Sequence, residues 1–177
     1  EIPGTTRDAV DTYFQFDGQP LVLIDTAGIR RAGKVQHSVE YYSLLRAVRA
    51  IERTDVALVM IDAADGIADG DKRVGGYAHE AGRAIVIVVN KWDLVKGTGT
   101  AMKAFAQNVR KEMPFMDYAP IVFASAKEGK GVREVLDSAI LAAQSHALRL
   151  STGEINRLIH DAVDEHPLSQ KGKQFKV

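Results

Sequence analysis

Four short apolar runs constrain the fold of this chain more than any other feature. They are rich in Val, Ile, Leu and Phe and are not interrupted by alternating polar residues, which is typical of strands buried on both faces. The runs are residues 21–25, 56–62, 84–90 and 121–124. Because both faces of such a sheet must be covered, the chain is expected to fold with helices on either side of it.

Between the runs, apolar residues recur at the spacing of a helix. This spacing predicts helices over residues 41–51, 69–81, 102–109 and 132–143. Strands and helices therefore alternate, which predicts a mostly parallel sheet with right-handed crossovers. Residues 10–16, followed by Asp-Gly and then by residues 21–25, predict a hairpin that adds one antiparallel edge strand. The expected fold class is α/β, in three layers.

The end of the chain has a different pattern. Ser151 and Glu154 have the spacing of a capping box and begin an amphipathic run that Pro167 ends. Residues 171–177 then begin a basic, alternating pattern typical of a strand. The end of the chain therefore predicts a helix followed by a strand that stops in mid-pattern, an α+β arrangement.

The composition excludes several classes of protein. The chain has 177 residues, and its 23 Lys and Arg balance its 23 Asp and Glu, so any contact with nucleic acid must rest on a local patch. The absence of cysteine excludes disulfides, thiolate catalysis and Cys-ligated metals. The apolar runs are too short to cross a bilayer and the first residues lack a signal-peptide pattern, so we expect a cytoplasmic protein without membrane contact.

Polar residues follow three of the apolar runs at the point where each run ends. The three segments are Asp25-Thr26-Ala27-Gly28, Asn90-Lys91-Trp92-Asp93 and Ser125-Ala126-Lys127. Because ligand-binding residues in an open α/β sheet lie at the carboxyl ends of its strands, we expect these segments to meet at one edge. The alternative is that they are ordinary solvated loops, which does not explain why three of them occur in this order.

The second segment has the chemistry to select guanine. The Asp93 carboxylate can accept hydrogen bonds from N1–H and the exocyclic amine of guanine, whereas adenine has an acceptor at N1 and no such amine. We expect Lys91 to lie over the base plane and Asn90 to tie neighbouring loops together. The backbone N–H of Ala126 could donate to guanine O6, and Trp92 is expected to serve packing.

The first segment suits a phosphate and a metal ion. The Asp25 carboxylate could hold Mg²⁺ through water, and the backbone N–H of Gly28 can approach a terminal phosphate because no Cβ intervenes. Residues 3–8 precede the first predicted strand, and the hydroxyl of Thr6 could complete the Mg²⁺ shell. A plain Pro-Gly turn is the alternative for this stretch.

These motifs resemble the translation-factor-like GTPases, and most closely the Der (double Era-like) family of bacterial ribosome-assembly GTPases. The resemblance covers nearly the whole chain and rests on P-G-T-T-R-D, D-T-A-G-I-R-R, residues 38–62, N-K-W-D, S-A-K and the final helix leading to a basic strand. Family members carry two GTPase domains followed by a KH-like domain. The resemblance implies that residues 1–148 belong to the second GTPase domain and that residues 151–177 begin the KH-like domain.

The resemblance also implies an activity, with assigned residues. It implies hydrolysis of GTP to GDP with Mg²⁺, coupled to assembly of the large ribosomal subunit, with ribosomal RNA as a partner of a monomeric protein. Thr6 and Gly28 would serve catalysis, and Thr6 and Asp25 would serve the metal. The nucleotide would be bound by Asp25, Gly28, Asn90, Lys91, Asp93, Ser125, Ala126 and Lys127.

Two features depart from related enzymes. The phosphate-binding pattern G-x-x-x-x-G-K-[ST] does not occur in residues 1–177, so we expect a fragment of a P-loop GTPase-like fold, truncated at both ends, that lacks the first strand and has a gap in its sheet. Ile29 follows D-T-A-G where Ras-like enzymes have a glutamine that orients water. The Der family shares such a hydrophobic residue, which implies hydrolysis stimulated by K⁺.

Two other functions remain as alternatives. The chain could belong to a module that binds GTP or RNA without hydrolysis, because it has no phosphate-binding loop of its own. It could also belong to an Era-like or tRNA-modification GTPase. Residues 38–62 and the basic strand after Pro167 favour the Der family over these relatives.

Overall fold

The computed structural model describes residues 10–25, 47–95, 99–165, 169–170 and 173–174. The chain forms two compact units, residues 1–146 and residues 147–177. Within the described residues, no helix combines the length and the apolar character needed to cross a membrane.

A parallel sheet of three strands forms the centre of the first unit. Its strands are β3 (Val56–Asp62), β4 (Ala84–Asn90) and β5 (Ile121–Phe123), in the order β3-β4-β5. β4 pairs in parallel with both neighbours. The bounds of β3 and β4 are those predicted from the apolar runs, and β5 ends one residue before the predicted run does.

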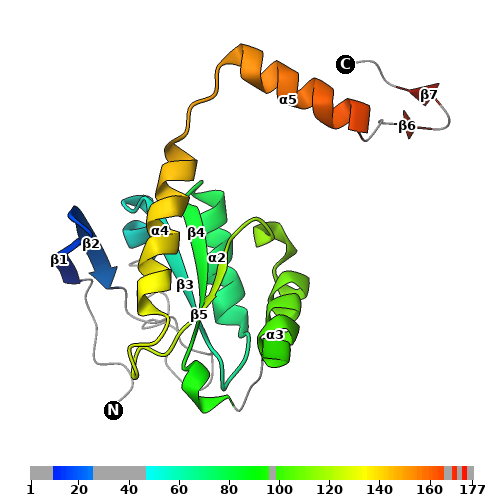
Figure 1. The fold of residues 1–177 in the computed structure, drawn as a ribbon. Coiled ribbons are helices and arrows are strands. Elements are labelled where there is room, and N and C mark those ends of the chain that lie inside the picture. Colours follow the sequence, from blue (N-terminus) through cyan, green and yellow to red (C-terminus); the bar gives the residue numbers. More distant parts are fainter. Residues whose placement is uncertain (1–9, 26–46, 96–98, 166–168, 171–172, 175–177) are drawn as a thin grey trace. The chain divides into compact units, whose positions relative to one another are not determined.

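Helices cover this sheet on both faces. They are α2 (Asp69–Glu80), α3 (Gly99–Glu112) and α4 (Val132–Ala147), and residues 47–52 are also helical. Figure 1 shows α4 and α2 on opposite sides of the strands. All four predicted helices have a helical counterpart, although α3 begins three residues before the predicted range and residues 41–46 lie outside the described residues.

The side chains of β4 divide the core into two halves. Ile85 and Ile87 belong to a buried cluster with residues of α2 and α3, whereas Val86 and Val88 belong to a second cluster with Val135 of α4. Neighbouring residues of a strand point to opposite faces, so each half of β4 meets a different layer of helices. All residues of β4 except the last are buried, as predicted for a strand covered on both faces.

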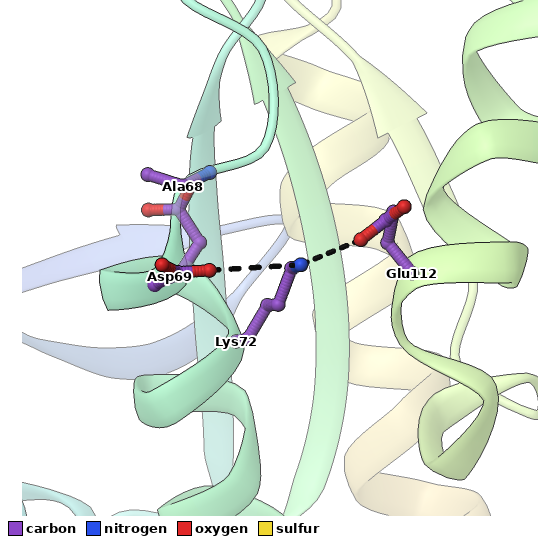
Figure 2. A network of polar contacts seen from close by, with 5 residues as sticks. Ala68, Asp69, Lys72 and Glu112 are labelled. Atoms are coloured by element: carbon purple, nitrogen blue, oxygen red, sulfur yellow. Dashed lines mark hydrogen bonds and ion pairs between the residues drawn. The ribbon is translucent and has the colours of Figure 1, made fainter.

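An ion-pair network links α2 to α3 on one side of the sheet. The ammonium of Lys72 lies 2.5 Å from a carboxylate oxygen of Glu112 and 3.7 Å from one of Asp69, as Figure 2 shows. At the beginning of α2, the Asp71 carboxylate accepts the backbone N–H of Ala68 at 2.8 Å. The pair with Lys72 holds the pKa of Glu112 below its ordinary value.

The hairpin of β1 (Val10–Phe16) and β2 (Gln19–Asp25) forms a sheet of its own. Asp17 and Gly18 make its turn with φ of 47° and 79°, as the Asp-Gly signal predicts. Among the described strands β2 pairs with β1 alone, so the division falls where the sequence predicts a gap. The expectation that β2 is buried on both faces is wrong: Val22 and Leu23 are 49% and 47% exposed, because only β1 flanks β2 among the described strands.

The second unit contains α5 (Thr152–Glu165) and a short antiparallel pair, β6 (Ser169–Gln170) with β7 (Lys173–Gln174). The capping box predicted before α5 is present. The Ser151 N–H donates to a Glu154 carboxylate oxygen at 2.8 Å, and the Glu154 N–H donates to Ser151 Oγ at 3.3 Å. Of the predicted strand over residues 171–177, only residues 173–174 lie within the described part of the chain.

Candidate functional site

The carboxyl ends of β3, β4 and β5 lie side by side, which brings two of the three predicted polar segments together. Asp62 is the register partner of Asn90 at the ends of β3 and β4. Beyond these ends, the Ala63 N–H donates to the Asn90 carbonyl at 2.9 Å, and the Trp92 N–H donates to the Ala124 carbonyl at 3.0 Å. Backbone hydrogen bonds therefore continue past the strands and hold the segments that follow them at one edge.

Asn90 ties the second and third polar segments together, as expected. Its side-chain oxygen accepts the backbone N–H of Ala126 at 3.0 Å. The same hydrogen bond affects the predicted role of Ala126. Its N–H already has a partner within the protein, so a contact with guanine O6 requires this N–H to be shared or released.

Lys91 begins a tight turn that presents Asp93. Its backbone has φ 60° and ψ 31°, in the left-handed region that residues with a Cβ rarely adopt. The single turn η1 (Trp92–Leu94) follows, and the Leu94 N–H donates to the Lys91 carbonyl at 3.0 Å. Asp93 is exposed on this turn, so its carboxylate can meet a ligand.

The ammonium of Lys91 is held by Asp62, a residue that belongs to none of the three polar segments. Lys91 Nζ lies 2.8 Å from one carboxylate oxygen of Asp62, and the other oxygen accepts the Ala64 N–H at 3.0 Å. The hydrogen bond with Lys91 is the main reason why the pKa of Asp62 lies below its ordinary value. The sequence contained one signal for Asp62: it ends an apolar run just as Asn90 does.

Trp92 packs, as predicted, rather than facing a ligand. Its ring makes edge contacts with Phe123 and Phe105, with centroids 4.6 Å and 5.7 Å apart. Phe105 lies on α3 and Phe123 ends β5. These rings therefore fix the Lys91 to Asp93 turn against the helical layer next to it.

The third segment is an ordered loop after β5. Ser125 is buried, its N–H donates to the Lys130 carbonyl at 2.9 Å, and its Oγ accepts the Glu128 N–H at 3.2 Å. Lys127 is exposed. Hydrogen bonding to Glu128, and to a smaller extent the charge of Asp93, raises the pKa of Lys130. The buried Ser125 thus stabilises the loop through its two hydrogen bonds to the loop backbone.

The predicted phosphate and metal residues cannot be placed in the same way. Thr6 and Gly28 lie outside the described residues, and Asp25 is known only as the last residue of β2, opposite Val10. Within the described ranges, no three His, Cys, Asp or Glu side chains are grouped to hold a metal ion. The described part of the candidate site is therefore the edge formed by the ends of β3, β4 and β5.

Several known proteins resemble this chain in sequence. The family model described as 50S ribosome-binding GTPase matches residues 1–91. A protein named GTPase Der from Oceanobacillus iheyensis is 54% identical over an alignment of 178 positions, which covers all of this chain and 41% of the relative. The GTPase Der of Pelotomaculum thermopropionicum is 48% identical over 177 residues, or 40% of its length. The chain thus spans about two fifths of the length of these curated relatives.

Solved structures share the fold. Era in complex with MgGDPNP and a segment of 16S ribosomal RNA superposes with a TM-score of 0.66 at 20% identity, over 98% of this chain and 51% of that one. The elongation factor SelB from Methanococcus maripaludis, in complex with a GTP analogue, gives 0.63 at 20% identity, over 82% and 30%. Both likenesses confirm the predicted α/β fold.

Proposed function

Because this chain belongs to the family of 50S ribosome-binding GTPases, we propose that the natural protein hydrolyses GTP to GDP and phosphate and reads guanine at the carboxyl edge of β4 and β5. The observation that carries the proposal is the hydrogen bond from Ala126 to Asn90, since it joins the two base-reading segments beside the exposed Asp93. Relatives named GTPase Der, about half identical over the whole chain, support this function over an Era-like one.

In this proposal the base is recognised by complementary hydrogen bonding. The Asp93 carboxylate accepts from N1–H and the exocyclic amine of guanine, and the Lys91 side chain covers the base plane. The Ala126 N–H donates to O6 when its bond to Asn90 is shared or released. Ser125 and Lys127 complete the site from the loop after β5. Adenine would leave the Asp93 carboxylate unpaired, which is a strong basis for discrimination.

The phosphate half of the proposed site rests on residue chemistry. Thr6 and Asp25 supply the hydroxyl and carboxylate oxygens that Mg²⁺ prefers, and the bound ion would neutralise phosphate charge. Gly28 offers a backbone N–H to the terminal phosphate. Ile29 cannot orient the attacking water, so hydrolysis in this protein depends on charge stabilisation, to which we propose that K⁺ contributes.

The partner we propose is the large ribosomal subunit, including its RNA. The family description supports it, and an Era structure that shares the fold is a complex with ribosomal RNA. Residues 151–177 begin the proposed KH-like domain, whose basic strand includes Lys173. We propose that the protein works as a cytoplasmic monomer.

The test is turnover by the full-length natural protein. We expect phosphate release from GTP but not from ATP, and faster release in potassium than in sodium salts at equal ionic strength. Equal rates with both nucleotides would refute the guanine site. Binding of GTP without turnover would instead favour a module that binds but does not hydrolyse, and equal rates in the two salts would refute the role of K⁺.

A further inference from the structure

Asp62 ends β3 with both carboxylate oxygens engaged. One accepts the Ala64 N–H at 3.0 Å, and the other lies 2.8 Å from the Lys91 ammonium. The Ala63 N–H also donates to the carbonyl of Asn90 at 2.9 Å, so the backbone beside Asp62 is bound to the end of β4. These contacts fix the orientation of the carboxylate, which is 28% exposed.

Lys91 depends on such a partner. Its side chain is 55% exposed, and a long exposed lysine ordinarily samples many rotamers. Its left-handed backbone directs the chain into the η1 turn, and the ion pair with Asp62 defines where the ammonium lies when no ligand is bound. With the charge held at one end, the methylene groups of Lys91 are left as an apolar strip.

We propose that Asp62 is a positioning residue of the guanine site: it anchors the Lys91 ammonium so that the methylene strip is already in place to cover the base read by Asp93. This inference rests on the proposed function. Asp62 does not touch the nucleotide and acts through Lys91. The benefit to affinity is that the freedom of the lysine side chain is lost before the nucleotide binds rather than when it binds.

The first test is Asp62→Asn in the full-length protein, with GDP and IDP affinities measured by calorimetry. Asparagine keeps an acceptor for the Ala64 N–H but loses the charge that holds Lys91. We expect both nucleotides to bind about fivefold more weakly. Their ratio should not change, because the exocyclic amine that IDP lacks is read by Asp93. General disruption of the site would change the ratio as well.

Two further variants keep the inference testable if Asp62→Asn folds poorly. Lys91→Met retains an apolar side chain without the charge, and in this background Asp62→Asn should weaken GDP binding no further. Asp62→Glu should recover binding relative to Asp62→Asn, because a carboxylate is again available. Glu112→Gln is the matched control, since it removes the carboxylate of another lysine ion pair, the one with Lys72, and neither residue is a predicted site residue.

The outcomes separate this inference from the proposed function. If the wild-type protein binds GDP no more tightly than ADP, the guanine site itself is refuted. If it prefers GDP but Asp62→Asn stays within about twofold of wild type, Asp62 does not position Lys91. Tighter GDP binding by Asp62→Asn would overturn the inference too, because the ion pair would then be holding Lys91 away from the base.

Discussion

β2 and β4 are two seven-residue strands with apolar runs, yet they differ in burial. β4 has a partner strand on each side and helices on each face, and its apolar residues are all buried. β2 is paired only with β1 among the described strands, and Val22 and Leu23 are about half exposed. An apolar run therefore indicates that the side chains of a strand are suited to burial. The strands and helices packed against that strand determine how far those side chains are actually buried.

The largest expected difference follows directly from this comparison. Ile87→Ala in β4 should lower the free energy of unfolding by about 3 kcal/mol, because it leaves a cavity at a fully buried position. Leu23→Ala in β2 should lower it by less than about 1 kcal/mol, because much of that side chain is already in water. Denaturant unfolding of the 177-residue chain, in which these exposures occur, measures both. Equal losses would show that β2 is as well covered as β4.

A second pair of variants compares two glycines that have the same backbone conformation but different space for a side chain. Gly129 and Gly131 have φ of 71° and 72°, but a Cβ would meet the Phe123 carbonyl only at Gly131. Gly129→Ala should cost about 1 kcal/mol for the left-handed backbone. Gly131→Ala should cost about 2 to 3 kcal/mol, because overpacking is added to that strain. The same unfolding assay decides, and equal costs would mean that the loop can move away.

The Lys72–Glu112 pair gives a smaller, pH-dependent effect between α2 and α3. Since the pKa of Glu112 is lowered in the folded protein, its stabilisation is complete above the ordinary glutamate pKa and is lost as pH falls through the folded value. The melting temperature of the wild type should therefore exceed that of Glu112→Gln at neutral pH, and the difference between the two should become smaller below about pH 4. If the difference in melting temperature does not change with pH, the ion pair is not its cause.

The smallest effect is expected where the hairpin meets the rest of its unit. Arg53 makes two hydrogen bonds to Asp11 of β1, at 2.9 Å and 2.5 Å, from an exposed position. Arg53→Lys cannot reproduce this paired geometry, so amide exchange in β1 should speed up by roughly two- to threefold while exchange in β4 stays unchanged. Faster exchange in both strands would show that they open together.

Local patterns in the sequence were sufficient for most of the fold. The strand bounds of β4, the Asp-Gly turn and the Ser151 capping box were all predicted, because each depends on residues close together in the chain. The exposure of Val22 was not predicted, because it depends on which strand lies beside β2. The gap predicted in the sheet already implied that β2 lacks a neighbouring strand on one side.

The candidate site shows the same limit. Asn90 and Trp92 were given the tying and packing roles that the structure shows, because their motif follows a buried strand. Asp62 was missed because its contact with Lys91 arises from the register of β3 with β4 and from one left-handed residue. Neither feature can be recognised from spacing alone.

The central claim is that Asp93 reads the guanine base, and Asp93→Asn tests it most directly. An asparagine amide can accept from N1–H and donate to the O2 of xanthine, whereas the exocyclic amine of guanine would then face a donor. Calorimetry on the full-length protein should show that wild type prefers GDP and that Asp93→Asn prefers XDP. A variant that still prefers GDP over XDP would contradict the account.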